Sequence, residues 1–173
     1  ALDPTQLEDA GLVERARRGD LAAFNAIVER YQGQVFNAAA RIVGDRQIAE
    51  DVAQEAFFAA HRALRGFRGG SLRAWLLRIA TNASYDYLRT TRRSRAQSLD
   101  LAMESPGFQP ASPGPSPEAE AERADLARTI QRALLALPED QRAVLVLVDV
   151  EGLAYEEAAE ATGASLGTVK SRL

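Results

Sequence analysis

A proline-rich stretch, ESPGFQPASPGPSPEAEAE, constrains the fold of this chain more than any other feature. It carries five prolines in nineteen residues. Proline lacks a backbone donor and blocks helix propagation, so this density gives a semi-extended spacer. The stretch therefore predicts a flexible linker over residues 96–124, with one folded unit before it (residues 10–95) and another after it (residues 125–173).

Both flanking units carry apolar residues at helical spacing. The first stripe comprises Phe24, Ile27, Val28, Tyr31 and Val35, and similar stripes predict helices over 48–63 and 72–87. The residues before Gly11 are polar and are expected to form a lead-in outside the folded unit. Only VLVLVDV has strand propensity, and helix-forming residues flank it. The predicted fold class is all-α, with two small helical domains joined by the proline-rich flexible linker.

The end of the chain has the spacing of a helix-turn-helix. Ala159 is small where two helices approach, Gly163 can adopt a positive φ in the turn, and Val169 can dock the second helix on the first. Ser165 is placed to cap that second helix. Its outward residues are Thr168, Lys170, Ser171 and Arg172. Hydroxyls and cations suit base edges and phosphates in the major groove, so we expect duplex DNA binding. A plain helical hairpin is the alternative.

A basic block follows the glycine-rich segment of the first unit. Nine arginines and a single acidic residue, Asp86, lie between Arg62 and Arg95. One stripe of the predicted helix carries Arg78, Asn82, Tyr85, Arg89 and Arg92. Cations can hold phosphates, an aromatic ring can stack on a base, and an amide can read a base edge, which favours single-stranded nucleic acid. A solvated helix face, half-buried packing of Tyr85 and a merely solvated Asn82 are the alternatives.

Composition narrows the remaining classes of function. The chain has no cysteine and one histidine, His61, which has no evident partner in AAHRAL. No carboxylate cluster completes a metal site, and no phosphate-cradling glycine motif with lysine is present. No apolar run reaches the roughly 20 residues that span a membrane. We expect a cytoplasmic protein with no catalytic residues, no metal and no cofactor.

Three segments carry a resemblance to a known family. DRQIAEDVAQEAFFAAHRAL, FRGGSLRAWLLRIATNASYDYLR and LPEDQRAVLVLVDVEGLAYEEAAEATGASLGTVKSRL occur in this order. They resemble the bacterial RNA polymerase sigma factors of the extracytoplasmic-function (ECF) group. The resemblance implies a promoter-specificity subunit that binds core RNA polymerase and promoter DNA. It also implies an anti-sigma partner. In these terms residues 10–95 are similar to sigma region 2, which recognises and melts the −10 element, and residues 125–173 to region 4, which reads the −35 element.

The resemblance also implies roles for particular residues. The acidic helix, with Asp51, Gln54, Glu55 and Phe57, is similar to the segment that binds the clamp helices of the largest polymerase subunit; the polymerase flap is the second expected contact. The −10 set comprises the loop residues Arg68, Gly69, Gly70 and Ser71 together with the stripe from Arg78 to Arg92. The −35 set comprises Ser165, Thr168, Lys170, Ser171 and Arg172. Within the −10 set, Asn82 matches the family asparagine that contacts a flipped base.

Two features depart from the family pattern. Many members carry a charged residue and a slightly longer loop where Gly70 stands here, which bears on the shape of the base pocket. The chain stops at Leu173, within the expected recognition helix, whereas members normally continue with a further basic turn. A stand-alone helix-turn-helix regulator, which would bind promoter DNA without polymerase, is the alternative function.

Overall fold

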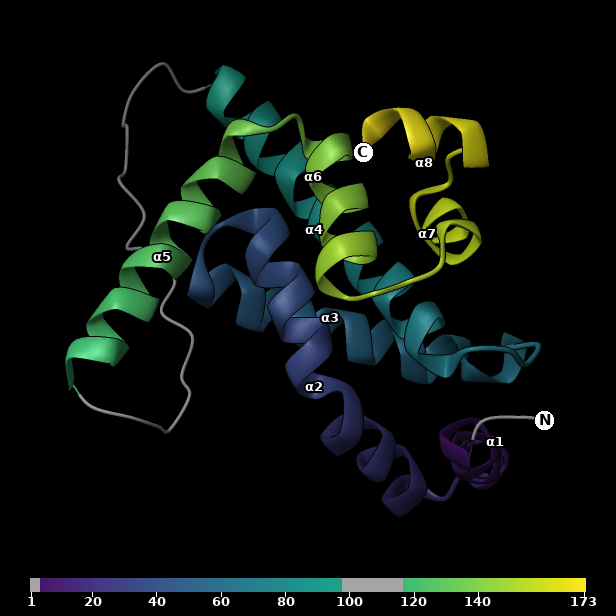
Figure 1. Ribbon diagram of the computed structural model, residues 1–173. Helices are drawn as coiled ribbons and strands as arrows, with labels where there is room; N and C mark the ends of the chain where they lie inside the picture. Colours follow the sequence, from purple (N-terminus) through teal and green to yellow (C-terminus); the bar gives the residue numbers. More distant parts are fainter. Residues whose placement is uncertain (1–3, 98–116) are drawn as a thin grey trace.

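A computed structural model describes residues 4–97 and 117–173 as an all-helical protein (Figure 1). The elements are α1 (Pro4–Arg17), α2 (Leu21–Val43), α3 (Arg46–Ala63), the 3-10 turn η1 (Leu64–Gly66), α4 (Leu72–Gln97), α5 (Pro117–Ala136), α6 (Glu139–Leu145), the π-helical turn η2 (Val146–Val150), α7 (Tyr155–Thr162) and α8 (Leu166–Arg172). No strand occurs in these two ranges. The all-α prediction is confirmed, and VLVLVDV is helical.

Short polar side chains and glycines set the helix boundaries. Asp20 accepts a hydrogen bond from the Ala23 amide at the start of α2, and Asp45 does the same for α3. Each satisfies a backbone donor that has no partner within its helix. Gly44 ends α2 with φ 84° and Gly163 ends α7 with φ 69°, in the left-handed region that glycine adopts without steric cost.

The first unit packs α1 to α4 around one apolar core. The predicted stripe of α2 is largely buried, with Phe24, Ile27, Tyr31 and Val35 in the same cluster. The residues before Gly11, expected to be a polar lead-in outside the folded unit, instead begin α1, which spans residues 4–17 and places Val13 in that cluster. The buried Asp9 carboxylate accepts hydrogen bonds from Tyr31 and Arg30 of α2. Partners on another helix thus order a segment that looks like a tail in the sequence.

The second unit, α5 to α8, lies directly against the first. In Figure 1, α7 lies beside α4, and the interhelical contacts pair α7 with α4 and α5 with α2. A single apolar cluster spans the boundary; it joins Ala38, Ile42 and Leu77 of the first unit to Leu134, Leu147, Leu153 and Ala158 of the second. The two units therefore share buried surface.

Both ends of the predicted linker are helical. Helix α4 continues to Gln97, and α5 begins at Pro117, inside the range assigned to the spacer. Proline is well suited to the first position of a helix because its φ is preset and its missing N–H needs no partner there. The EAEAE run that follows is made of good helix formers. The rest of the predicted linker, residues 98–116, lies outside the described residues.

Candidate nucleic-acid interface

The cation–amide stripe lies on one face of α4. Arg78, Asn82, Arg89 and Arg92 are exposed, and Tyr85 is half-buried. Ser71 sets the register of this helix by accepting a hydrogen bond from the Ala74 amide at 3.1 Å. On the opposite side, Thr81 and Ser84 are fully buried, and their hydroxyls donate to carbonyls one turn earlier. The polar stripe therefore remains at the surface of a helix that is otherwise packed on several sides.

The second unit covers one edge of this face. Tyr85 packs against the shared core, and a recess beside it is lined by Leu137, Pro138 and Glu139 of the α5–α6 turn. Burial raises the pKa of the Tyr85 phenol to about 12. At the same edge Arg92 approaches Glu139 at 3.8 Å. In this arrangement of the units the tyrosine is screened from solvent, whereas Asn82 is open.

A glycine-rich loop and a cavity adjoin the start of α4. Gly69 and Gly70 have φ values of 93° and 88°, which other residues rarely adopt. The cavity has a volume of about 540 Å³, and the loop residues 66–71, Trp75 and Arg78 form its first-unit wall. Phe67 is buried, with its ring 5.2 Å from that of Trp75. Helix α7 supplies the opposite wall through Glu157 and Glu160.

The helix-turn-helix prediction agrees with the geometry of α7 and α8. Ser165 caps α8 by accepting from the Thr168 amide at 3.1 Å, and Val169 is fully buried beneath it. Lys170 and Ser171 are exposed. Thr168 and Arg172 are less free than the sequence indicates.

Both of these side chains have partners inside the second unit. The Thr168 hydroxyl is hydrogen-bonded to Ser165 at 2.8 Å, and Arg172 pairs with Asp140 of α6 at 2.7 Å. A phosphate that contacts Arg172 would therefore have to compete with this carboxylate. Ser171 is exposed, although its hydroxyl donates to the Thr168 carbonyl at 2.9 Å, and the exposed Lys170 is the cation of the predicted −35 set that is open to a phosphate.

The predicted polymerase-binding residues of α3 line two different grooves. Asp51 and Glu55 line a groove of about 600 Å³ that α3 forms with α4, and Asn82 lies in the same groove. Gln54 and Phe57 line a second groove, of about 590 Å³, between α3 and α2. Asp51, Gln54 and Glu55 are exposed, and Phe57 is half-buried against the core. The predicted polymerase-binding residues thus lie on both sides of one helix.

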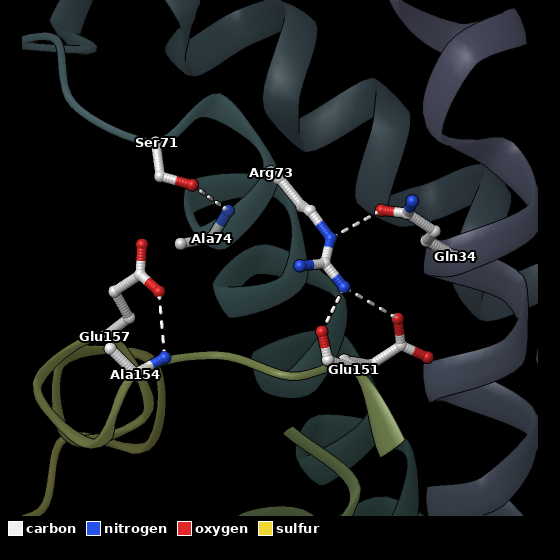
Figure 2. A network of polar contacts seen from close by, with 7 residues as sticks. All are labelled: Gln34, Ser71, Arg73, Ala74, Glu151, Ala154 and Glu157. Carbon is white, nitrogen blue, oxygen red and sulfur yellow. Dashed lines mark hydrogen bonds and ion pairs between the residues drawn. The ribbon is translucent and has the colours of Figure 1, made fainter. Parts of the chain in front are cut away.

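The sequence does not show that Arg73 joins the two units through partners far away in the chain. In Figure 2, Arg73 of α4 donates to Gln34 Oε1 of α2 at 2.8 Å and to the main-chain carbonyl of Glu151 in the second unit. The Glu151 carboxylate lies 3.5 Å from the same guanidinium and is buried. The partners are 39 and 78 positions away, so no local spacing signals this network.

Other chemistries find no support in the part of the chain that the structure describes. No three His, Asp or Glu side chains come close enough there to hold a metal ion. The ring of His61 packs edge-on against Phe24 at 4.8 Å. None of the described helices is long and apolar enough to cross a membrane.

Models of known protein families match both units of the chain. The family model of sigma-70 region 2 matches residues 27–94, which hold the α4 face and its loop. The model of sigma-70 region 4 matches residues 127–173, which hold the helix-turn-helix. The chain belongs to the sigma-70 family. The alternative of a stand-alone helix-turn-helix regulator is not favoured, because the first unit has its own region 2 match. Sigma factors are transcription initiation factors rather than enzymes.

Individual relatives place this sigma factor in the ECF group. It is 40% identical to the RNA polymerase sigma-H factor of Pseudomonas aeruginosa, an alignment that covers 98% of this chain and 90% of that protein. It is also 40% identical to the ECF RNA polymerase sigma-E factor of Escherichia coli, with 97% and 90% covered.

Two solved structures share the all-helical fold. The sigma factor RpoE of Bartonella quintana, in complex with the anti-sigma factor NepR, is 28% identical with a TM-score of 0.72; 87% of this chain and 89% of that chain are covered. CnrH, in complex with the cytosolic domain of CnrY, is 26% identical with a TM-score of 0.68, and 96% and 90% are covered.

Proposed function

We propose that this sigma factor binds core RNA polymerase in the cytoplasm, reads both promoter elements and helps to open the −10 region. Helix α8 contacts the paired −35 element, and the exposed face of α4 holds a strand whose bases have left the stack. The observation that carries the proposal is the adjacency of this face to the Phe67–Ser71 loop and its cavity. Arg78 belongs to both this face and the cavity wall, and Asn82 lies one turn further along α4, in the groove that also holds Asp51 and Glu55.

The free energy gained when the protein binds an unpaired base is similar in size to the cost of flipping that base out of the stack. Flipping a base out of the stack costs a few kcal/mol. Stacking a base on an aromatic side chain recovers roughly 1–3 kcal/mol, and the cations add a favourable contact with each phosphate. Binding of an unpaired strand can therefore tip a nearly balanced opening without hydrolysis of ATP. Tyr85 can contribute its ring only where the α5–α6 turn has moved away from it.

Polymerase contacts are assigned to α3. Asp51, Gln54 and Glu55 are exposed along this helix, and Glu55 is held by Arg62 at 3.0 Å. Phe57 adds apolar surface beside Gln54 in the groove toward α2. We assign this acidic surface to the clamp helices of the largest polymerase subunit, and we assign the second unit to the flap. An anchor on polymerase would place both DNA-binding units on the same promoter.

Run-off transcription tests this proposal. Core polymerase is supplied with the protein and a promoter library, and the transcribed promoters are identified by sequencing. On the selected promoter, Asn82→Ala should lower transcription about tenfold, the size expected for loss of one specific polar contact. Binding to core polymerase should stay unchanged. Asn25→Ala is the matched control, because Asn25 is an exposed asparagine on α2, away from the α4 face. Lost polymerase binding in Asn82→Ala would contradict the assignment.

A regulatory partner is also proposed. Two structurally similar proteins, CnrH and the sigma factor RpoE, were solved with bound partners, and the partner of RpoE is named an anti-sigma factor. By analogy this sigma factor is held inactive by an anti-sigma protein of its own. Co-purification of a partner whose addition abolishes run-off transcription, while its removal restores it, would support this.

A further inference from the structure

Arg17, at the end of α1, reaches the beginning of the glycine-rich loop. Its Nε donates to the main-chain carbonyl of Leu64 at 3.1 Å, and its Nη2 donates to the carbonyl of Phe67. These partners lie 47 and 50 positions further along the chain. The guanidinium is a planar fork, so two simultaneous hydrogen bonds fix the orientation of both carbonyls.

The neighbouring arginines of α1 have other partners. Arg15 pairs with Asp20 at 2.7 Å, and Arg18, which directly follows α1, approaches Glu14 of that helix at 3.6 Å. Arg18 is exposed, whereas Arg17 is half-buried. Contact with the loop is therefore a property of Arg17 in particular and does not follow from a basic run as such.

The two acceptor carbonyls, those of Leu64 and Phe67, lie directly before the glycine-rich loop and set its direction. Leu64 opens the 3-10 turn η1, and its carbonyl also accepts a hydrogen bond from the Phe67 amide at 3.2 Å. Phe67 is the last residue before the exposed Arg68-Gly69-Gly70 segment, and its buried ring packs beside Trp75 on the cavity wall. A shift of the Phe67 backbone would move the ring and the loop together.

The loop itself needs such an anchor. Two consecutive glycines have more backbone freedom than any other pair, and a Cβ built at Gly69 or Gly70 would meet no atom within 4 Å apart from those of its chain neighbours. Ser71 fixes the far end of the loop by capping α4. Arg17 fixes the near end, so the three residues between Phe67 and Ser71 are held from both sides. Preorganisation of this kind lowers the entropy lost on binding a ligand.

We propose that Arg17 is a positioning residue for the strand-binding loop, which it holds in the geometry that admits an unpaired base to the cavity. Arg17 acts through Leu64 and Phe67 and does not itself contact DNA. The inference rests on the proposed function for its ligand, a single DNA strand. It adds α1 to the elements that determine how the −10 strand is bound.

The test measures binding of single-stranded DNA to the complex of the full chain with core polymerase. Two fluorescent oligonucleotides carry the selected −10 sequence, and one of them is abasic at the flipped position. Arg17→Ala should weaken binding of the intact strand about tenfold while changing that of the abasic strand less than about twofold. Arg17→Lys, with a single point of attachment, should fall between wild type and Arg17→Ala. Arg18→Ala is the matched control and should bind like wild type.

Amide hydrogen exchange provides a readout that does not depend on DNA. Gly69 and Gly70 should exchange faster in Arg17→Ala than in wild type, with no change in Arg18→Ala. Equal weakening of both oligonucleotides, or the same effect in Arg18→Ala, would overturn the inference. If the wild type itself bound neither strand, the proposed function would fail. Unchanged exchange at the two glycines in Arg17→Ala would then decide separately against the positioning role.

Discussion

Arg142 places a positive charge in the interior and binds only main-chain oxygens. Its guanidinium donates to the carbonyls of Leu134, Leu135 and Leu137, which end α5, and to that of Ile42 at the end of α2. Burial lowers the pKa of this arginine, which nevertheless keeps its charge at any ordinary pH. Carbonyls at a helix C-terminus carry partial negative charge and lack partners within the helix. One side chain therefore satisfies the ends of two helices from different units.

Loss of this side chain should destabilise the protein strongly. Arg142→Leu keeps the apolar stem but leaves four carbonyls without their donor, so we expect a loss of about 2–4 kcal/mol in the free energy of unfolding. Urea denaturation followed by circular dichroism measures it. Arg132→Leu is the control, since Arg132 is exposed on α5 and contacts only Thr129, and it should cost less than about 0.5 kcal/mol. Equal midpoints for the two variants would contradict the role of Arg142.

Contacts between residues close in the sequence, such as helix caps, could be predicted, whereas hydrogen bonds between residues far apart in the sequence could not. The predicted cap Ser165 depends only on a residue three positions away, and its side chain accepts from the Thr168 amide as expected. Arg17, Arg73 and Arg142 look like ordinary surface cations in the sequence, because their acceptors are carbonyls brought near only by folding. The part of the candidate site that depends on these three contacts therefore needed the structure.

At the scale of elements, the end of α2 is in tight contact with the second unit. Gly44 caps this helix with a positive φ, and Leu135 of α5 lies directly over it. A Cβ built at Gly44 would stand 2.5 Å from a Leu135 methyl carbon. Gly44 thus permits the left-handed backbone conformation, and its lack of a side chain leaves space for Leu135 of the other unit.

Paired substitutions separate these two effects. Gly163→Ala meets open space at φ 69°, so it should cost only the left-handed penalty of about 1–2 kcal/mol. Gly44→Ala should cost about 1 kcal/mol more, since Leu135 must also move. In a Leu135→Ala background that excess should disappear. Urea midpoints of the four variants complete the comparison, and an excess that survives Leu135→Ala would show that the clash is not its cause.

Helix existence was easier to predict than helix length. The stripes of α2, α3 and α4 have the 3.6-residue period and were identified. Helices α1 and α5 were missed or shortened, since each begins at a proline, a residue that both stops one helix and starts another. The choice between these effects depends on packing further along the helix, as Val13 and Leu134 show by their burial.

At the scale of the whole molecule, the two units form one buried boundary. The sequence predicts two compact bodies on a tether, and the stripes that it shows account for the core of each. Ala38 and Leu77 lie off those stripes, yet both are fully buried against the second unit. Polar contacts flank this apolar surface: Gln131 donates to the carbonyls of Ala40 and Arg41 on one side, and Arg73 binds Glu151 on the other. The apolar stripes in the sequence therefore do not reveal that the two units pack against each other.

The buried Glu151 carboxylate should make this boundary sensitive to pH. Burial raises its pKa above the usual 4.5, although Arg73 and Arg41 oppose the shift. A group whose pKa is higher in the folded chain than in the unfolded chain binds protons more tightly when folded. Its favourable contribution is therefore complete below pH 4.5 and is lost as the pH rises through the raised pKa. Glu151→Gln carries no titrating group at this position.

As the pH rises from about 4 to about 8, the stability of Glu151→Gln should therefore increase relative to that of wild type, where stability means the free energy of unfolding. Urea midpoints in a series of buffers at constant ionic strength measure the difference at each pH. Asp149→Asn is the matched control, because Asp149 is exposed two residues away; an equal gain in that variant would show that the effect does not come from the buried position of Glu151. If wild type instead gained on Glu151→Gln as the pH rose, the ion pair with Arg73 would outweigh burial. The carboxylate would then stabilise the contact between the units in its charged form.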